Sequence, residues 1–91
     1  MLEEIALPEG LLRLHSGAFS QCINLQKVTL NTRLKRIDDG AFYGCRSLRE
    51  VQWNDSLQSI GAEAFMDCRY LRAPVLAPSV EIGKNAFKGT K

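Results

Sequence analysis

The chain has 91 residues, of which 45% are hydrophobic and 24% charged, and its formal net charge is +2. This length allows one small domain with a modest core, so a binding site has to lie on the surface or in a shallow groove. The small net charge gives no reason to expect nucleic acid or an anionic membrane as a partner. No apolar run reaches the roughly 18–20 residues that a transmembrane helix needs.

A repeat of 22–23 residues runs through the sequence. A phenylalanine recurs at this interval, always after an alanine, and a cysteine follows it three residues later in all but the last repeat. Leucine, valine and isoleucine occupy further positions in the same register. The members of the first two columns are Phe19, Phe42, Phe65, Phe87, Cys22, Cys45 and Cys68. These columns predict a solenoid in which each repeat is one coil and stacked coils share a continuous core.

The predicted elements follow the same order in each repeat. Residues 25–30 read Leu-x-x-Val-x-Leu, and their period-two alternation predicts a short strand. A polar turn at residues 31–32 comes next, and residues 34–37 predict a second short extended piece. A glycine-bearing turn then leads into Ala-Phe-x-x-Cys, which is too short for a full helix and predicts one helical or 3₁₀ turn. In the fourth repeat Pro74 replaces the strand valine, which leaves regular stacking in doubt there.

Residues 40–48, Gly-Ala-Phe-Tyr-Gly-Cys-Arg-Ser-Leu, carry the signature of a known repeat. Together with the Leu-x-x-Val-x-Leu and Leu-x-x-Ile segments, they resemble the BspA-like leucine-rich repeat over essentially the whole chain. The resemblance implies an α/β-type repeat solenoid, mostly β and irregular, built as a right-handed stack of coils with short parallel strands. It also implies a protein that binds macromolecules, often at a bacterial or protist cell surface.

We expect residues 1–91 to form a single leucine-rich repeat array of about four coils of 22–23 residues. Both ends of the chain fall inside a coil and no polar cap is visible, whereas solenoids generally shield their terminal coils. We therefore expect a segment of a longer protein, with neighbouring repeats or subunits covering the ends. The segment Met1–Ile5 is acidic where a secretory signal would be basic, so the sequence does not determine the compartment.

The outward face of the predicted strands is the first candidate site. If Val28 and Leu30 face the core, the residues between them face outward, and the resemblance makes this face the expected surface for a protein partner. The candidate residues are Lys27, Thr29, Asn31, Glu50, Gln52, Asn54 and Val75. The alternative is an ordinary solvated face on which Lys27 and Glu50 form a weak ladder, or, near Val75, a surface covered by the next segment.

A basic ridge is the second candidate site. Two columns of cations, four and seven residues after the phenylalanine, would lie along one edge of the stack and attract phosphate or carboxylate groups. They are Arg46, Arg49, Arg69, Arg72 and Lys91. The alternative is a solvated edge that nearby acidic residues neutralise, namely Glu50, Asp55 and Asp67.

The remaining reactive residues favour a structural role. Stacked cysteines do not point their Cβ atoms at one another as a disulfide requires, and no CxxC pair or histidine cluster supplies a tetrahedral metal site. Phenylalanines in one phase with alanine, and Trp53 in a leucine column, indicate core, although the indole is large enough to reach the surface. His15 is the single histidine, and no phosphate loop or nucleophile elbow is present.

The sequence therefore predicts a protein-binding module that is not an enzyme and needs no cofactor or metal. The alternative is a structural scaffold or accessory subunit buried within a larger multi-protein assembly. An enzyme would require catalytic residues outside this segment.

Overall fold

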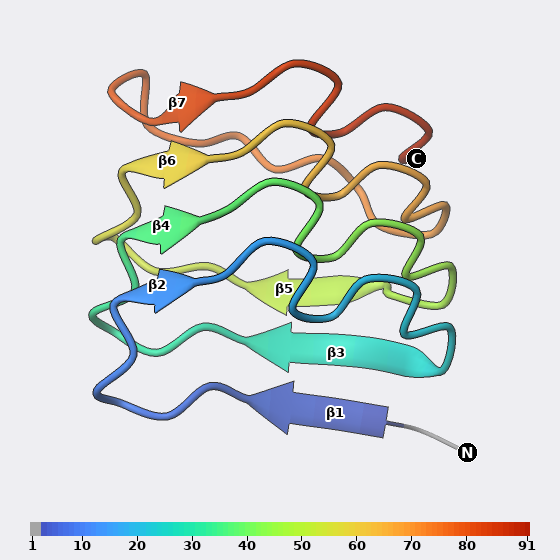
Figure 1. Cartoon of the computed structure of the whole chain (residues 1–91), viewed down its shortest axis with the longest axis horizontal. Coiled ribbons are helices and arrows are strands. Elements are labelled where there is room, and N and C mark those ends of the chain that lie inside the picture. The colour runs from blue at the N-terminus through green and yellow to red at the C-terminus, as the bar shows by residue number, and fades with distance from the viewer. Residues whose placement is uncertain (1–2) are drawn as a thin grey trace.

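The computed structural model describes residues 3–91 and consists of short parallel strands joined by turns. Three strands form sheet A, in the order β1 (Glu3–Ala6), β3 (Leu25–Thr29) and β5 (Glu50–Gln52). Four form sheet B, in the order β2 (Arg13–Leu14), β4 (Arg36–Ile37), β6 (Ser59–Ile60) and β7 (Glu81–Ile82). The chain alternates between the two sheets and advances by one coil at each circuit, which confirms the predicted leucine-rich solenoid (Figure 1).

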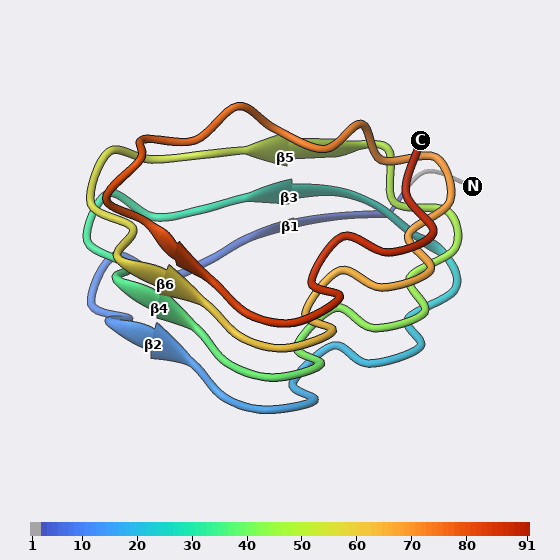
Figure 2. The same cartoon turned by 90° about the horizontal axis from the view of Figure 1, so that it is seen from above.

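Seen from above, the coils lie over one another as a flattened loop (Figure 2). Sheet A follows one long side of the loop, and sheet B with the turns after it follows the other. No helix in the described part of the chain is long and apolar enough to cross a membrane.

Register between the strands places like residues on top of one another. In sheet A, Val28 pairs with Ile5 on one side and with Val51 on the other. In sheet B, Ile60 pairs with both Ile37 and Ile82. A single coil cannot bury its own apolar side, so the repeated sequence gains stability only when equivalent positions stack. The fully buried residues follow this rule: Val28, Leu34, Ala41, Phe42, Cys45, Leu48, Ala64, Phe65 and Cys68.

The phenylalanine column forms the predicted stack of rings. The centroids of Phe19 and Phe42 are 5.4 Å apart, those of Phe42 and Phe65 5.0 Å, and those of Phe65 and Phe87 5.3 Å, with planes within 13° of parallel. Trp53 meets this column edge-on, 5.4 Å from the Phe65 ring centroid and 6.4 Å from that of Phe87. The indole is only half-buried, so a leucine column widened to tryptophan does reach the surface.

The segment after each sheet B strand differs from the single helical or 3₁₀ turn that the sequence favours. Around Phe19, alternate amides bond within the coil and across to the next coil. The amides of Ala18 and Ser20 donate to carbonyls three residues back, whereas the amide of Phe19 donates to the carbonyl of Ala41 at 2.7 Å. In a helix all these hydrogen bonds would lie within one coil. Here every second amide instead donates to a carbonyl of the next coil.

Positive φ angles also keep the turns after the sheet B strands from forming a helix. Residues with positive φ begin and end each turn, at 68° for Gly17 and 59° for Gln21 in the first coil. Glycine adopts this left-handed region without steric cost, whereas other L residues pay roughly 1–2 kcal/mol. Two such residues within five positions interrupt any helical run.

The fourth coil loses its sheet A strand but keeps the rest of the stack. Residues 71–77 form no strand, because Pro74 has no amide proton for the ladder. Beyond it, β7 pairs with β6, and Phe87 stacks on Phe65 at an interplanar angle of 2°. The fourth repeat is also one residue shorter than the others, between Val80 and Ile82. This shortening does not prevent stacking in sheet B.

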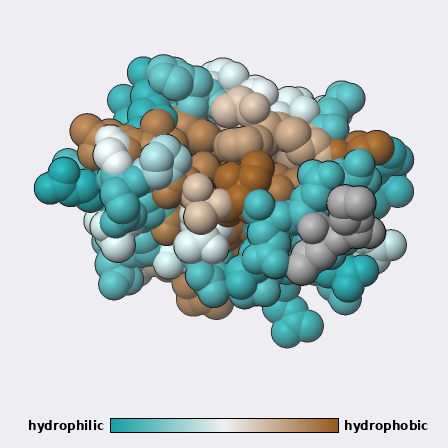
Figure 3. All heavy atoms as spheres, turned by 90° about the horizontal axis from the view of Figure 1, so that it is seen from below, coloured by the Kyte–Doolittle hydropathy of each residue, from teal (hydrophilic) through white to brown (hydrophobic). Residues whose placement is uncertain are grey.

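The N-terminal end of the stack exposes part of the apolar core. Ile5, Leu11, Phe19 and Cys22 pack against the core from this side and are only half-buried. Figure 3 shows this end, where hydrophobic atoms occupy the centre of the face and hydrophilic atoms surround it.

Candidate binding surfaces

The outer face of sheet A carries four of the predicted strand-face residues in two cross-strand pairs. Lys27 Nζ on β3 lies 3.9 Å from Glu50 Oε2 on β5. Two residues further along the strands, Thr29 Oγ1 donates to Gln52 Oε1 at 3.4 Å. All four side chains are exposed or half-buried, because strand alternation turns them away from Val28.

Asn31 does not belong to this outer face, and the expectation that it points outward is wrong. Asn54 is half-buried, and its side-chain amide also bonds to the backbone. Asn31 is only 3% exposed, and its Nδ2 donates to the carbonyls of Glu9 at 3.2 Å and Leu11 at 2.7 Å. Strand alternation ends at Thr29, the last residue of β3, so it no longer sets the direction of the next side chains. The turn carbonyls need donors when they are buried, and the asparagine amides supply them.

Asn54 holds the next turn in the same way. Its Nδ2 donates to the carbonyls of Asn31 at 2.7 Å and Leu34 at 3.1 Å. Its Oδ1 accepts from the amides of Ser56 at 3.1 Å and Leu57 at 3.0 Å. The buried Oδ1 of Asn31, by contrast, has no hydrogen-bond partner within residues 3–91. These two asparagines tie successive coils together.

An apolar pocket of about 390 Å³ lies beside sheet A where the fourth strand is absent. We call it the Trp53 pocket. Val75, another predicted strand-face residue, is fully exposed at this pocket because residues 71–77 form no strand. The pocket lining is Trp53, Asn54, Asp55, Leu57, Val75, Leu76, Ala77 and Val80. Sequence reasoning placed Trp53 in the core and missed this pocket, although the proline in a strand position was the available signal.

The basic ridge residues all have exposed side chains: Arg46, Arg49, Arg69, Arg72 and Lys91. Arg46 and Arg69 line an open pocket of about 380 Å³ on one side and a second pocket of about 220 Å³ on the other. We call these two pockets together the arginine groove. The guanidinium carbon of Arg49 lies 5.6 Å from the ring centroid of Tyr70, a cation–π contact.

Acidic residues do not neutralise this ridge through ion pairs. The part of the chain that the structure describes has two ion pairs, Arg13 with Asp38 and Lys27 with Glu50. The sequence suggests Glu50 as a neutralising group, but its carboxylate is the one that faces Lys27 on the outer side of sheet A. Asp67 lines the smaller pocket of the groove without approaching a cation within 4 Å.

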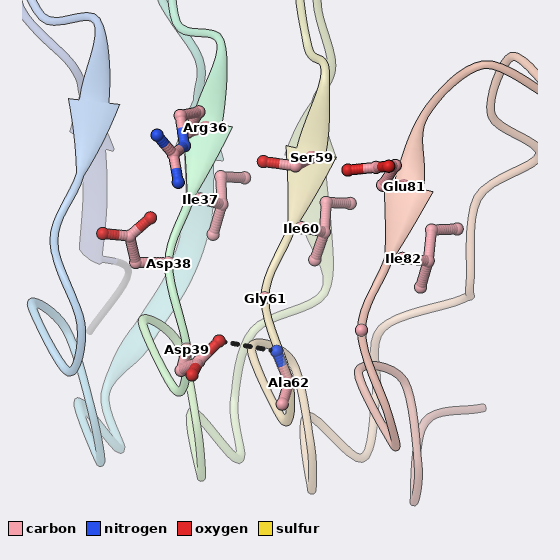
Figure 4. Close-up of a pocket in the computed structure, with 11 residues that line it drawn as sticks. Arg36, Ile37, Asp38, Asp39, Ser59, Ile60, Gly61, Ala62, Glu81 and Ile82 are labelled. Carbon is pink, nitrogen blue, oxygen red and sulfur yellow. Dashed lines mark hydrogen bonds between the residues drawn. The ribbon is translucent and has the colours of Figure 1, made fainter.

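A further open pocket, of about 390 Å³, lies over sheet B. Arg36, Ser59 and Glu81 form one row across β4, β6 and β7, and the isoleucines that follow them form the next row (Figure 4). Asp39 Oδ1 accepts from the amide of Ala62 at 2.8 Å, as the dashed line shows. Sequence reasoning did not single out this surface.

Close packing between coils limits what the sheet B pocket can bind. A Cβ atom added at Gly61 would overlap the backbone of Asp38 and Asp39, so glycine is required where coils approach most closely. Asp38 is already paired with Arg13, and Asp39 with the Ala62 amide. Both carboxylates are therefore committed to holding the coils together.

Comparison with protein families identifies the repeat. The family model described as BspA type Leucine rich repeat region (6 copies) matches residues 1–91. The chain belongs to the BspA-type leucine-rich repeat family. The resemblance to this family that the sequence predicts over essentially the whole chain is thereby confirmed.

Two solved structures of leucine-rich repeat proteins have a similar fold. The leucine-rich repeat protein of T. pallidum (TpLRR) is 31% identical with a TM-score of 0.84, and the match covers 92% of this chain and 42% of that one. A leucine-rich repeat protein from Eubacterium ventriosum ATCC 27560 is 23% identical with a TM-score of 0.82, and the match covers 97% of this chain and 30% of that one. The chain thus spans less than half of either protein. No curated protein matches its sequence.

The cysteines of this BspA-type chain are part of its core. Cys45 Sγ donates to the carbonyl of Phe19 at 3.1 Å, and Cys68 Sγ donates to that of Phe42 at 3.2 Å. Cys22 is half-buried, and burial raises the pKa of its thiol. No three His, Cys, Asp or Glu side chains gather into a metal-binding group within residues 3–91. These contacts support the prediction that the column is structural.

Proposed function

We propose that this chain is a non-catalytic protein-binding module whose partner docks on the outer face of sheet A and in the Trp53 pocket. The observation that carries this proposal is the position of an apolar pocket directly beside rows of exposed polar side chains. Binding energy in protein interfaces concentrates in apolar or aromatic anchors, and a polar rim around them supplies specificity. Here Trp53 and Val75 form the anchor region, and Lys27 and Gln52 lie on the rim.

The cross-strand pairs on the outer face of sheet A are suited to recognition because the paired strands hold their side chains in fixed positions. Lys27 and Glu50 come from adjacent strands whose backbones are paired in register, as do Thr29 and Gln52. Side chains on a rigid ladder lose less conformational entropy when a partner binds than side chains on a mobile loop. Asn31 supports the face from below and is not proposed as a contact, whereas the half-buried Asn54 lines the Trp53 pocket.

The place of this module within a whole protein follows from the same reasoning. We infer a single array of about four coils within a longer surface or secreted protein, in which neighbouring repeats or subunits cover the apolar N-terminal end. The fully exposed Val75 would also suit the alternative, a scaffold subunit buried in an assembly. The comparisons do not favour that alternative.

A panning experiment tests the proposed face. Random peptides displayed on phage are selected on the 91-residue chain and then measured against a variant carrying Lys27→Glu, Gln52→Arg and Val75→Arg. We expect the selected peptides to lose binding by about tenfold or more, because the variant removes the apolar anchor and inverts a rim charge.

The matched control carries Arg36→Glu, Ser59→Arg and Ile82→Arg on sheet B. It makes the same three kinds of charge change on the other sheet, and circular dichroism checks that both variants fold. Selected peptides should bind this control as they bind the parent chain. Equal binding to the strand-face variant and to the control would reject the outer face of sheet A as the site.

A further inference from the structure

We propose that the arginine groove binds an anionic polysaccharide that lies along the stacking direction of the coils. The groove is on a different face from the strand-face site, on the turns that lead into sheet A. The proposal is therefore independent of the protein-binding function.

The groove is built by the same two positions in three successive coils. Its larger pocket is lined by Ile23 and Asn24, by Arg46 and Ser47, and by Arg69 and Tyr70. Equivalent positions in neighbouring coils lie about 4.8 Å apart, the spacing of paired strands. The groove therefore crosses the coils and presents a cation in each of two adjacent coils, with Lys91 in the same column of the next.

The charge of the groove is available to a ligand. Arg46 and Arg69 line the groove, and Arg49 and Arg72 form the neighbouring column of the basic ridge. All four arginines are exposed and belong to neither of the two ion pairs recorded for residues 3–91. The smaller pocket also holds the carboxylate of Asp67, which forms no ion pair within that part of the chain. The four arginines lie within two adjacent coils, so their fields overlap over a screening length of about 8 Å at physiological salt. Guanidinium groups bind carboxylate and sulfate oxygens in a bidentate manner. These arginines are therefore suited to direct contact with such groups and not only to attracting small counterions.

Neutral groups between the cations favour a sugar chain over a simple polyanion. Tyr70 is 55% exposed, and the guanidinium of Arg49 lies over one face of its ring. Sugar rings present C–H faces that pack on aromatic rings and hydroxyl groups that hydrogen-bond to amides and hydroxyls. Asn24 and Ser47 supply such groups in the same pocket.

Other polyanions fit less well. Arginine clusters also bind acidic peptide motifs, so charge alone does not choose between a peptide and a polysaccharide. The exposed Tyr70 beside Asn24 and Ser47 is what favours a sugar in this open, largely polar groove. Single-stranded nucleic acid is bound by a series of aromatic rings that stack on successive bases. The groove has two rings, Tyr70 in the larger pocket and the half-buried Tyr43 in the smaller one, which is too few for such a series.

Affinity for a heparin octasaccharide tests the proposal, measured by calorimetry at about 0.15 M salt. The variant Arg46→Ser, Arg69→Ser should bind about tenfold or more weakly, since two guanidinium contacts are lost. The control Arg33→Ser, Lys35→Ser removes the same charge from exposed positions between β3 and β4 and should bind like the parent chain. No binding by the parent, or equal loss in both variants, would overturn the proposal.

Competition and a third variant separate the sources of negative charge. Tyr70→Ala should weaken octasaccharide binding by about threefold or more while leaving the fold intact. Polyglutamate, polyuridylate and phosphatidylserine vesicles at equal charge should compete poorly. Equal competition by any of them, or an unchanged Tyr70→Ala variant, would contradict a sugar-specific groove. The strand-face variant should retain octasaccharide binding, so the two proposals can fail separately.

Discussion

Asn31 and Asn54 occupy the same position in adjacent coils but satisfy different numbers of backbone groups. Asn54 forms four hydrogen bonds to the backbone, two through Nδ2 and two through Oδ1. Asn31 forms two, both through Nδ2, and its buried Oδ1 has none within the described chain. The cost of removing each side chain should follow this difference.

Asn54→Ala is expected to destabilise the fold by about 2–4 kcal/mol, because each lost hydrogen bond contributes roughly 0.5–1.5 kcal/mol and two amides lose their acceptor. Asn31→Ala should cost about 1–2 kcal/mol, since it also removes an unsatisfied oxygen. Urea unfolding of both variants measures the two values. If Asn31→Ala proves the more costly, the hydrogen-bond assignment of these turns is wrong.

At the scale of elements, one residue decides whether a coil contributes to sheet A. Residues 71–77 have the leucines of a strand at Leu71 and Leu76, yet no strand forms there. Pro74 stands where Val28 and Val51 stand in the paired strands. The absent strand leaves the Trp53 pocket open, so the same substitution shapes the proposed binding site.

Pro74→Val is expected to extend sheet A by a fourth strand paired with β5, because it restores the missing amide donor and a β-branched side chain. The variant should gain slowly exchanging amides in residues 71–77 and narrow the Trp53 pocket. Hydrogen–deuterium exchange measures the first effect. Pro74→Ala is the control, as it restores the donor without the branched side chain and should gain less protection. Unchanged exchange in both variants would mean that proline is not what prevents the strand.

At the scale of the whole molecule, the core is one continuous column of stacked residues to which every coil contributes. Phe42 and Phe65 are fully buried between ring neighbours on both sides, and Cys45 and Cys68 are buried beside them. No coil can expose these residues without separating from its neighbours. We therefore expect the two buried thiols to become accessible only when the stack opens.

Thiol labelling tests this expectation. At neutral pH, iodoacetamide should modify half-buried Cys22 slowly, and Cys45 and Cys68 only as fast as the protein unfolds. Burial raises the pKa of Cys22, so its labelling rate should keep rising at pH values above about 8.5, where a free thiol is already half ionised. Mass spectrometry of peptides from the native and urea-unfolded chain measures each site. Rapid native labelling of Cys68 would contradict a closed core.

The raised pKa of Cys22 also predicts a direction for stability. Above the pKa of the unfolded thiol, about 8.5, the unfolded chain loses protons that the folded chain retains. The contribution of Cys22 to the free energy of unfolding should therefore fall as the pH rises through this range, and this thiol should have no effect at neutral pH.

The sequence by itself determined the solenoid. Columns of phenylalanine, cysteine and leucine in one register have a common explanation only if equivalent positions stack, because each repeat is too short to bury its own apolar side. That argument correctly predicted the ring stack of Phe19, Phe42, Phe65 and Phe87, and the buried cysteines. It also identified Pro74 as the place where the strand pattern breaks.

Only the tertiary structure decided the details of the surfaces. The side-chain amides of Asn31 and Asn54 donate to carbonyls that belong partly to neighbouring coils, and a linear pattern of strand alternation does not encode those partners. The same reason applies to the arginines, because whether a carboxylate neutralises a guanidinium depends on distances across coils. The sequence offered Glu50 both Lys27 and the arginines as partners, and the structure pairs it with Lys27. Periodicity records which residues share a column, whereas hydrogen bonds and ion pairs depend on where the columns meet in space.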